Sequence, residues 1–213
     1  MFGDGPLTFW EFKTREPWPL ATVQDAMLFE FLPGRKDVVL CGSQAVNAYV
    51  EQMRLTQDMD LVSTHAEKLT EEVKEFLHRR FHMELGIRTV RRGVGYRVDQ
   101  IRKPKDRHLV DVRSAEALPP SQLVQEVLVL TPPELICRKV ISMVDRTRRT
   151  KSFLDKADLF RLLLTFPYLK TAEGPVSECL RTVESSPQVM AAWNDLVSQE
   201  ILPDDDESKF LRP

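Results

Sequence analysis

The sequence predicts an α/β first half followed by an all-helical second half. Up to about residue 130, short apolar runs alternate with helical patterns, whereas only helical patterns follow. The run 37–41 is continuously apolar and rich in Val, which indicates a buried strand. Prolines 132 and 133 mark the join, so we expect an N-terminal arm at 1–20, a core domain at 21–130 and a helical domain at 131–213.

Local patterns predict the individual elements in order. Thr22 and Ser43 are suitable helix N-caps, and Pro133 suits the first turn of a helix. After residue 83 the apolar period changes from helical spacing to two, with turn residues between the runs. The expected strands are 37–41, 58–63, 84–90, 95–101, 108–114 and 125–131. The expected helices are 22–32, 43–53, 66–81, 133–146, 152–166, 175–185 and 187–199.

Composition indicates a cytoplasmic globular protein. The chain has 213 residues and a formal net charge of −2, and no apolar run approaches the roughly 20 residues of a membrane span. The first residues have no basic leader before an apolar segment, so we expect no signal peptide. The three cysteines are odd in number and widely spaced, which predicts neither a disulfide framework nor a metal knuckle and suits a reducing cytosol.

Positive charge is concentrated in two segments. Residues 79–107 contain ten Arg and Lys against three acids, and residues 138–161 contain eight against three. Such segments are compatible with a polyanion partner such as nucleic acid, although surface charge runs also occur simply as solvated faces.

Two aspartates carry the main chemical signal. Asp58 and Asp60 lie two residues apart on a predicted strand, so they point to one side while Met59 and Leu61 point into the core. Neighbouring carboxylates repel, and oxygen ligands with room for water suit Mg²⁺ or Mn²⁺. Asp111 would supply a third acid, and we prefer it to Asp99 because its flanks are more apolar. The alternative for an Asp-x-Asp pair is a strand end and a partner for an arginine.

A small-residue turn precedes the aspartates. Gly42 and Ser43 follow a strand and open a helix, which would place backbone N–H groups and a hydroxyl where a phosphate could bind. Gly42 would let the phosphate approach the backbone closely. A phosphate site, metal carboxylates and a third acid, in that order, favour nucleotidyl transfer.

The run 42–61, GSQAVNAYVEQMRLTQDMDL, resembles the signature of the nucleotidyltransferase superfamily. Its last part is especially similar to the minimal AbiEii-type members found in toxin–antitoxin pairs. The resemblance implies a polymerase-beta-like mixed sheet with helices, followed by a helical bundle. It also implies an active site in the cleft between the halves.

Two later segments extend the resemblance, which covers roughly 36–165. The helix that begins at Pro133 is similar to the family's lysine-bearing helix, here with Lys139, and residues 153–163 are similar to its Asp-x-x-Asp-Leu segment, here with Asp155 and Asp158. The family commonly has an arginine between them. This chain offers Arg146, Arg148 and Arg149 for that position.

The resemblance implies a transferase that moves a nucleotide from an NTP onto an acceptor hydroxyl. In AbiEii-like relatives the acceptor is RNA, notably the 3′ end of tRNA, and an antitoxin protein is a partner. By this resemblance Asp58 and Asp60 bind the metal, together with Asp111 as the third acid chosen above. Gly42 and Ser43 bind the nucleotide with Lys139, and the catalytic set is Asp58, Asp60, Asp111, Lys139 and Asp158. The alternatives are a transferase acting on an aminoglycoside-like alcohol and a non-catalytic binding module of the same fold.

The other candidate residues favour structural roles. The four histidines, His65, His78, His82 and His108, are scattered, and we expect them on the surface. Trp10 and Trp18 suit anchors of the N-terminal arm, and the cysteines suit buried structural positions.

Overall fold

The computed structural model describes residue 11 and residues 17–90 and 94–203. Most of the expected N-terminal arm, including Trp10, and the 91–93 turn lie outside the described residues. The chain divides into two compact units, Met1–Thr131 and Pro132–Pro213, each of which is described by itself.

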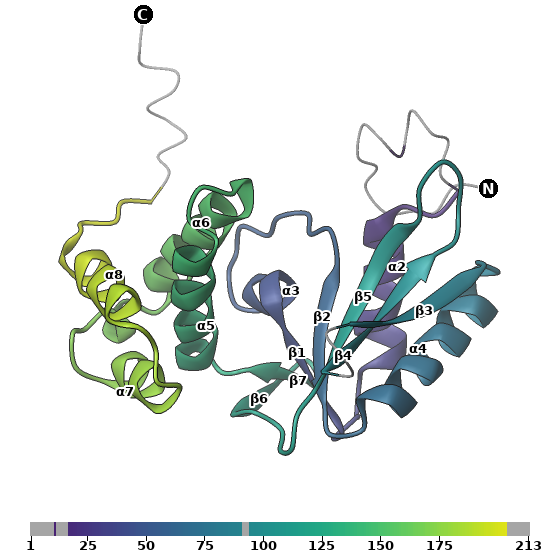
Figure 1. Cartoon of the computed structure of the whole chain (residues 1–213), viewed down its shortest axis with the longest axis horizontal. Coiled ribbons are helices and arrows are strands. Elements are labelled where there is room, and N and C mark those ends of the chain that lie inside the picture. The colour runs from purple at the N-terminus through teal and green to yellow at the C-terminus, as the bar shows by residue number, and fades with distance from the viewer. Residues whose placement is uncertain (1–10, 12–16, 91–93, 204–213) are drawn as a thin grey trace, which may run out of the picture. The chain divides into compact units, whose positions relative to one another are not determined.

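The first unit is built on a seven-stranded mixed sheet with the order β3-β4-β5-β2-β1-β7-β6 (Figure 1). β2 pairs in parallel with β5 and β1 in parallel with β7, whereas the other neighbours are antiparallel. The strands are β1 (Val38–Cys41), β2 (Met59–Ser63), β3 (Leu85–Val90), β4 (Gly95–Gln100), β5 (Arg107–Ser114), β6 (Ser121–Val124) and β7 (Val127–Leu130). The expected fold class, a mixed α/β sheet followed by helices, is confirmed.

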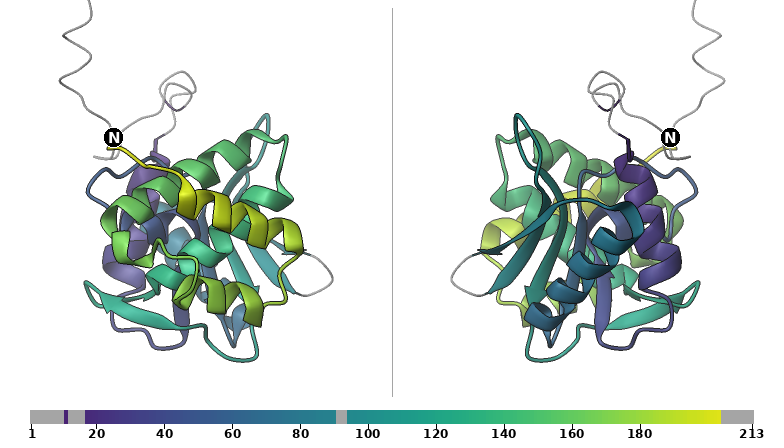
Figure 2. Two further views of the ribbon diagram at one scale, coloured as in Figure 1. Left: turned by 90° about the vertical axis from the view of Figure 1, so that its left-hand side faces the viewer. Right: turned by 90° about the vertical axis from the view of Figure 1, so that its right-hand side faces the viewer.

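The helices of this unit are α2 (Leu20–Ala26), continued by a π-helical turn (Met27–Phe31), then α3 (Gly42–Asn47) and α4 (Ala66–Phe81). α2 and α4 lie side by side on one face of the sheet (Figure 2). α4 buries Leu69, Val73 and Leu77 at helical spacing. Met59 and Leu61 are fully buried, as the strand alternation predicts.

Two expected elements differ from the structure. The helix predicted at 43–53 ends at Asn47, because the Asn47 side chain donates to Arg54 O and accepts from Arg54 N and so closes a loop instead. The single strand predicted at 125–131 is one arm of a hairpin with β6. Gln125 and Glu126 both have positive φ and form its two-residue turn, a conformation that glycine or asparagine usually signals.

Every regular element of the second unit within residues 132–203 is a helix. The unit contains α5 (Pro132–Asp145), α6 (Thr150–Thr165), a short 3-10 turn (Pro167–Leu169), α7 (Pro175–Thr182) and α8 (Pro187–Ser198). Trp193 and Leu180 are fully buried in it. Among the helices of the described residues, none combines the length and apolar character that crossing a bilayer needs.

Cys137 on α5 and Cys179 on α7 form a disulfide, with Cα atoms 6.2 Å apart. The expectation of no disulfide was therefore wrong for this pair. The two cysteines are 42 positions apart in sequence, so no local pattern reveals the pair, and the packing of α7 on α5 brings the two sulfurs together. Cys41 is buried on β1 and takes no part in a disulfide.

A buried ion network joins α5 to α6. Lys139 Nζ donates to Asp155 Oδ1 at 3.0 Å and to Asp158 Oδ2 at 2.7 Å. Arg146 Nη1 donates to the other oxygen of Asp155 at 3.2 Å, and the Arg161 guanidinium donates to Asp158. Because Lys139, Asp155 and Asp158 are all buried, each charge depends on the others for its solvation.

We expect Lys139→Met to lower the free energy of unfolding by about 3 kcal/mol, because it removes the ammonium that two buried carboxylates share. Urea unfolding followed by circular dichroism measures the change. The control Lys151→Met removes an exposed lysine on α6 and should stay within about 0.5 kcal/mol of wild type. A loss below about 1 kcal/mol for Lys139→Met would contradict the structural role of the network.

Candidate functional site

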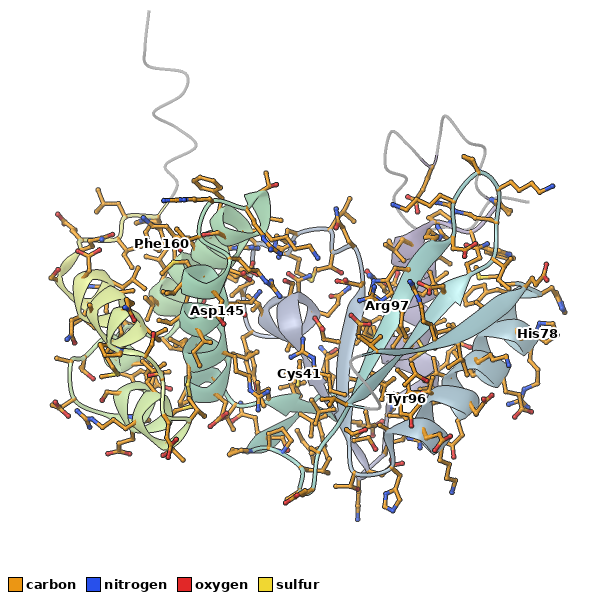
Figure 3. The ribbon with its side chains drawn as sticks, viewed as in Figure 1. Cys41, His78, Tyr96, Arg97, Asp145 and Phe160 are labelled. Carbon is orange, nitrogen blue, oxygen red and sulfur yellow. A yellow bond between two sulfur atoms is a disulfide. The ribbon has the colours of Figure 1, made fainter. Side chains whose placement is uncertain are left out.

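A row of charged side chains crosses the centre of the sheet. Asp60 on β2 is in register with Asp111 on β5, and Asp111 is in register with Arg97 on β4. Residues in register share a face, so these three side chains lie next to one another on the face opposite Met59 and Leu61. Arg97 is labelled in Figure 3. The predicted preference for Asp111 over Asp99 matches this placement, because Asp99 is turned to Arg88 at 2.6 Å instead.

A β-bulge adds a histidine to this row. Val98 pairs with Val110, but Asp99 pairs with His108, so Leu109 is an extra residue on β5. Leu109 and Val110 are both buried, and the alternation shifts by one place. His108 therefore reaches the same side as Asp111, although residues three apart on a regular strand face opposite sides. The sequence pattern did not single out His108, whose side chain is 23% exposed in this position.

His108 lies between two carboxylates. Its Nδ1 is 3.3 Å from Asp58 Oδ2 and its Nε2 is 3.1 Å from Asp111 Oδ1. The Nε2 contact is poorly aligned for a hydrogen bond, so its attraction is mainly that of charge. Burial by itself would lower the pKa of His108, but the contacts with Asp111 and Asp58 outweigh it and raise the pKa to about 9.

Arg97 holds the third carboxylate. Its Nε and Nη2 donate to the two oxygens of Asp111 at 2.8 and 3.0 Å, a bidentate pair. Burial would raise the pKa of the Asp111 carboxyl, but His108 and Arg97 together hold it far below its usual range. Asp111 is therefore ionised at any ordinary pH and is a weak base in this arrangement.

The Asp60 side chain leaves room only for glycine at position 42. Gly42 has a φ of +65°, and a Cβ placed on it would lie 2.1 Å from Asp60 Oδ2 and 2.9 Å from Asp60 Cβ. The close approach expected for a phosphate is thus made in this structure by the Asp60 side chain. On its other side Asp60 Oδ1 is 3.3 Å from Arg113 Nη2.

Ser43 lies directly after this glycine and contacts an arginine that the pattern of acids did not single out. Arg54 Nη2 donates to Ser43 Oγ at 2.6 Å. Four cationic groups near the predicted carboxylates and turn were therefore missed, namely Arg54, Arg97, His108 and Arg113. Only the position of Arg54 within the quoted run 42–61 could have drawn attention to it.

The donor set fits a divalent cation. Asp58, His108 and Asp111 each offer one ligand atom, and these atoms lie within 4.8 Å of one another. Carboxylate oxygens suit Mg²⁺ or Mn²⁺, and an imidazole nitrogen is compatible with Mn²⁺. Asp60, the other predicted ligand, is next to Asp111 in the sheet but is contacted by Arg113.

The predicted residues of the second unit form their own group. Lys139, Asp155 and Asp158 are brought together in the buried network described above, and of the three candidate arginines Arg146 is the one that joins it. Arg148 and Arg149 are exposed.

One of the structural matches described below supports the fold. No protein-family model and no curated protein matches the chain in sequence. A solved structure of a proposed nucleotidyltransferase from H. pylori matches with a TM-score of 0.50 at 13% identity, over 90% of this chain and 94% of that one.

Two further solved structures match with lower scores. An antigenic nucleotidyltransferase-like protein from Paracoccidioides brasiliensis has a TM-score of 0.43 at 17% identity, over 89% of this chain and 95% of that one. The Megavirus polyadenylate synthase has a TM-score of 0.47 at 12% identity, over 96% of this chain and 39% of that one. The chain thus has the fold of nucleotidyltransferase-like proteins, an assignment that rests on the H. pylori match.

We expect Gly42→Ala to destabilise the protein more than Gly34→Ala. Both glycines have positive φ, so alanine adds about 1–2 kcal/mol of backbone strain at each. Only Gly42 meets a neighbour within 4 Å, and since Asp60 Cβ is involved, rotating the carboxylate does not relieve the overlap. Urea unfolding should show a further loss of about 1–3 kcal/mol for Gly42→Ala, and equal losses would contradict the contact.

We expect His108 to stabilise the metal-free protein at low but not at high pH. Its pKa in the folded protein, about 9, exceeds its ordinary value of 6.5. The stabilisation is therefore complete below pH 6.5 and is lost as the pH rises through 9.

Urea unfolding of wild type and of His108→Asn, in the presence of EDTA and at pH 6, 8 and 10, measures the free energy that His108 contributes. The two proteins should differ by about 1–2 kcal/mol at pH 6, allowing for partial solvent exposure, and should converge by pH 10. If the difference between the two proteins does not change with pH, the charged imidazolium of His108 does not stabilise the folded protein.

Proposed function

We propose that the chain is a metal-dependent nucleotidyltransferase that moves an NMP from an NTP onto an acceptor hydroxyl. The observation that carries the proposal is the meeting of Asp58, Asp60 and Asp111 on one side of β2 and β5, beside the turn at Gly42 and Ser43. The fold shared with nucleotidyltransferase-like proteins supports it.

In the proposed reaction the acceptor oxygen bonds to the α-phosphorus while the bond to the bridging oxygen breaks. Pyrophosphate leaves with that electron pair, and the acceptor proton passes to solvent. A divalent cation held by Asp58, Asp111 and Asp60 would neutralise the triphosphate and the developing charge. Because Arg97 and His108 keep Asp111 ionised, its part is to accept a hydrogen bond from the acceptor hydroxyl and orient it.

We take RNA as the acceptor. The basic segment 79–107 contributes Arg88 on β3 and Arg102 just after β4, and arginines bind a phosphate backbone independently of its sequence. The tRNA 3′ end, a toxin role and a partner antitoxin rest on the AbiEii-type resemblance of residues 42–61 alone. An aminoglycoside-like acceptor is the competing outcome of the experiment below.

The same resemblance is the basis for proposing that Lys139 contacts the triphosphate and that Asp158 belongs to the catalytic set. In the structure Lys139 Nζ already donates to two buried carboxylates. A phosphate contact would therefore require Lys139 to exchange one of these partners.

We expect label from an NTP to appear on RNA with wild-type protein and to be lost with Asp58→Ala/Asp60→Ala. Pure protein is incubated with Mg²⁺, total tRNA and each labelled NTP in turn. Label should be lost with the variant because the double substitution removes two of the residues that offer oxygen ligands to the metal. The rate should fall by about 10³-fold or more, as expected when the metal-binding groups are removed.

Glu84→Ala/Glu116→Ala is the matched control, since it removes two exposed acids of the same unit and the same charge. Near wild-type transfer by the Asp58/Asp60 variant would exclude these residues from the site. Metal-dependent NTP binding without label on RNA would favour a small-molecule acceptor.

A further inference from the structure

We propose that Arg54 is a phosphate-binding residue that anchors the phosphate tail of the nucleotide beside Ser43. The inference rests on the proposed function and names a residue on which nucleotide binding depends. It starts from the hydrogen bond of 2.6 Å between Arg54 Nη2 and Ser43 Oγ, which joins residues 11 apart in sequence.

The backbone at Arg54 is fixed from both sides. Asn47 Nδ2 donates to Arg54 O at 2.8 Å, and Arg54 N donates to Asn47 Oδ1 at 3.2 Å. These two bonds tie the residue to the end of α3, whose first residue is Gly42. The guanidinium therefore extends from a fixed point, and its Nη1 donates to Leu55 O at 3.2 Å.

A second set of bonds fastens the same loop to α2. Thr56 Oγ1 donates to Gln24 Oε1 at 3.1 Å, Gln24 Nε2 donates to Thr56 O at 3.4 Å, and Gln44 Nε2 donates to Gln24 Oε1 at 2.7 Å. Gln24 and Thr56 are buried, whereas Met53 and Leu55 are exposed. The loop is thus held by buried polar bonds and not by packing of its apolar side chains, which sets the positions of its backbone and of Arg54.

The position of the guanidinium relates it to the carboxylates. Ser43 follows Gly42, and Gly42 touches the Asp60 carboxylate. The Arg54 guanidinium is therefore hydrogen-bonded to the residue next to the glycine that the Asp60 side chain, a predicted metal ligand, approaches. A phosphate chain carries negative charge on each unit, so it can contact a cation at Asp58 and Asp60 with one phosphate and Arg54 with another.

Arginine suits this task better than lysine. Its planar guanidinium presents several N–H donors at fixed angles and matches phosphate oxygens in pairs, and it stays charged at every ordinary pH. Arg97 contacts Asp111 and Arg113 contacts Asp60, so the positive charges of these two arginines stabilise the ionised carboxylates. Arg54 differs from them in that one of its hydrogen bonds is donated to Ser43 Oγ, the hydroxyl of the turn predicted to bind phosphate.

The test is calorimetric binding of Mg²⁺-tripolyphosphate and Mg²⁺-ATP, without acceptor, to wild type and to Arg54→Gln, Arg54→Lys and Arg79→Gln. Arg54→Gln should weaken both ligands by about tenfold or more, the amount expected for a charge-assisted contact. Arg54→Lys should recover part of the loss because the charge remains. Arg79→Gln, an exposed arginine on α4, should bind as wild type does.

A loop-bracing role alone predicts a different pattern. Arg54→Gln and Ser43→Ala would then lower the melting temperature together and leave the Kd for tripolyphosphate unchanged, and this result would overturn the inference. Failure of wild type to bind tripolyphosphate would overturn it as well. The transfer assay keeps the two proposals apart, because transfer by Arg54→Gln with an unchanged KM for NTP refutes Arg54 only, whereas binding without transfer to any acceptor refutes the proposed function only.

Discussion

The repulsion among three carboxylates on one face of the sheet is the constraint on which the first unit depends. Asp58, Asp60 and Asp111 meet because β2 and β5 run parallel with Asp60 and Asp111 in register. In the absence of a cation this arrangement is unfavourable. Cationic side chains on neighbouring strands reduce this repulsion, because Arg97, His108 and Arg113 each contact one or two of the three acids.

This compensation determines what the carboxylates can do. Arg97 is bidentate to Asp111, so that carboxylate is ionised and directional but a poor proton acceptor. His108 touches both Asp58 and Asp111, which is also where a cation would coordinate. A divalent ion would therefore exchange with the imidazolium contact and keep the arginine contacts. For the proposed reaction, this arrangement favours orienting a hydroxyl against a polyphosphate over removing its proton directly.

The sequence predicted the features that depend on local pattern. Alternation placed Asp60 and Met59 on opposite faces, and apolar flanks singled out Asp111. It could not reveal contacts that depend on register between distant strands, such as Arg97 with Asp111, nor the bulge at Leu109 that turns His108 inward. The hairpin before β7 was missed because Gln125 and Glu126, without glycine, take positive φ. The Cys137–Cys179 disulfide likewise arises only from helix packing.

The two charge clusters of the chain differ in a way that separates structure from chemistry. In the second unit the side chains of Asp155 and Asp158 are 5% and 1% exposed and are satisfied by Lys139 and two arginines, so exchanging a partner would leave a buried charge unpaired. In the first unit Asp58, Asp60 and Asp111 are 21–24% exposed, so water and a ligand can reach them. Exchanging an ion-pair partner for a ligand therefore costs less free energy in the cluster of the first unit than in that of the second. This difference favours the β2–β5 face as the place of the proposed reaction, and it indicates that Lys139 first of all holds α5 against α6.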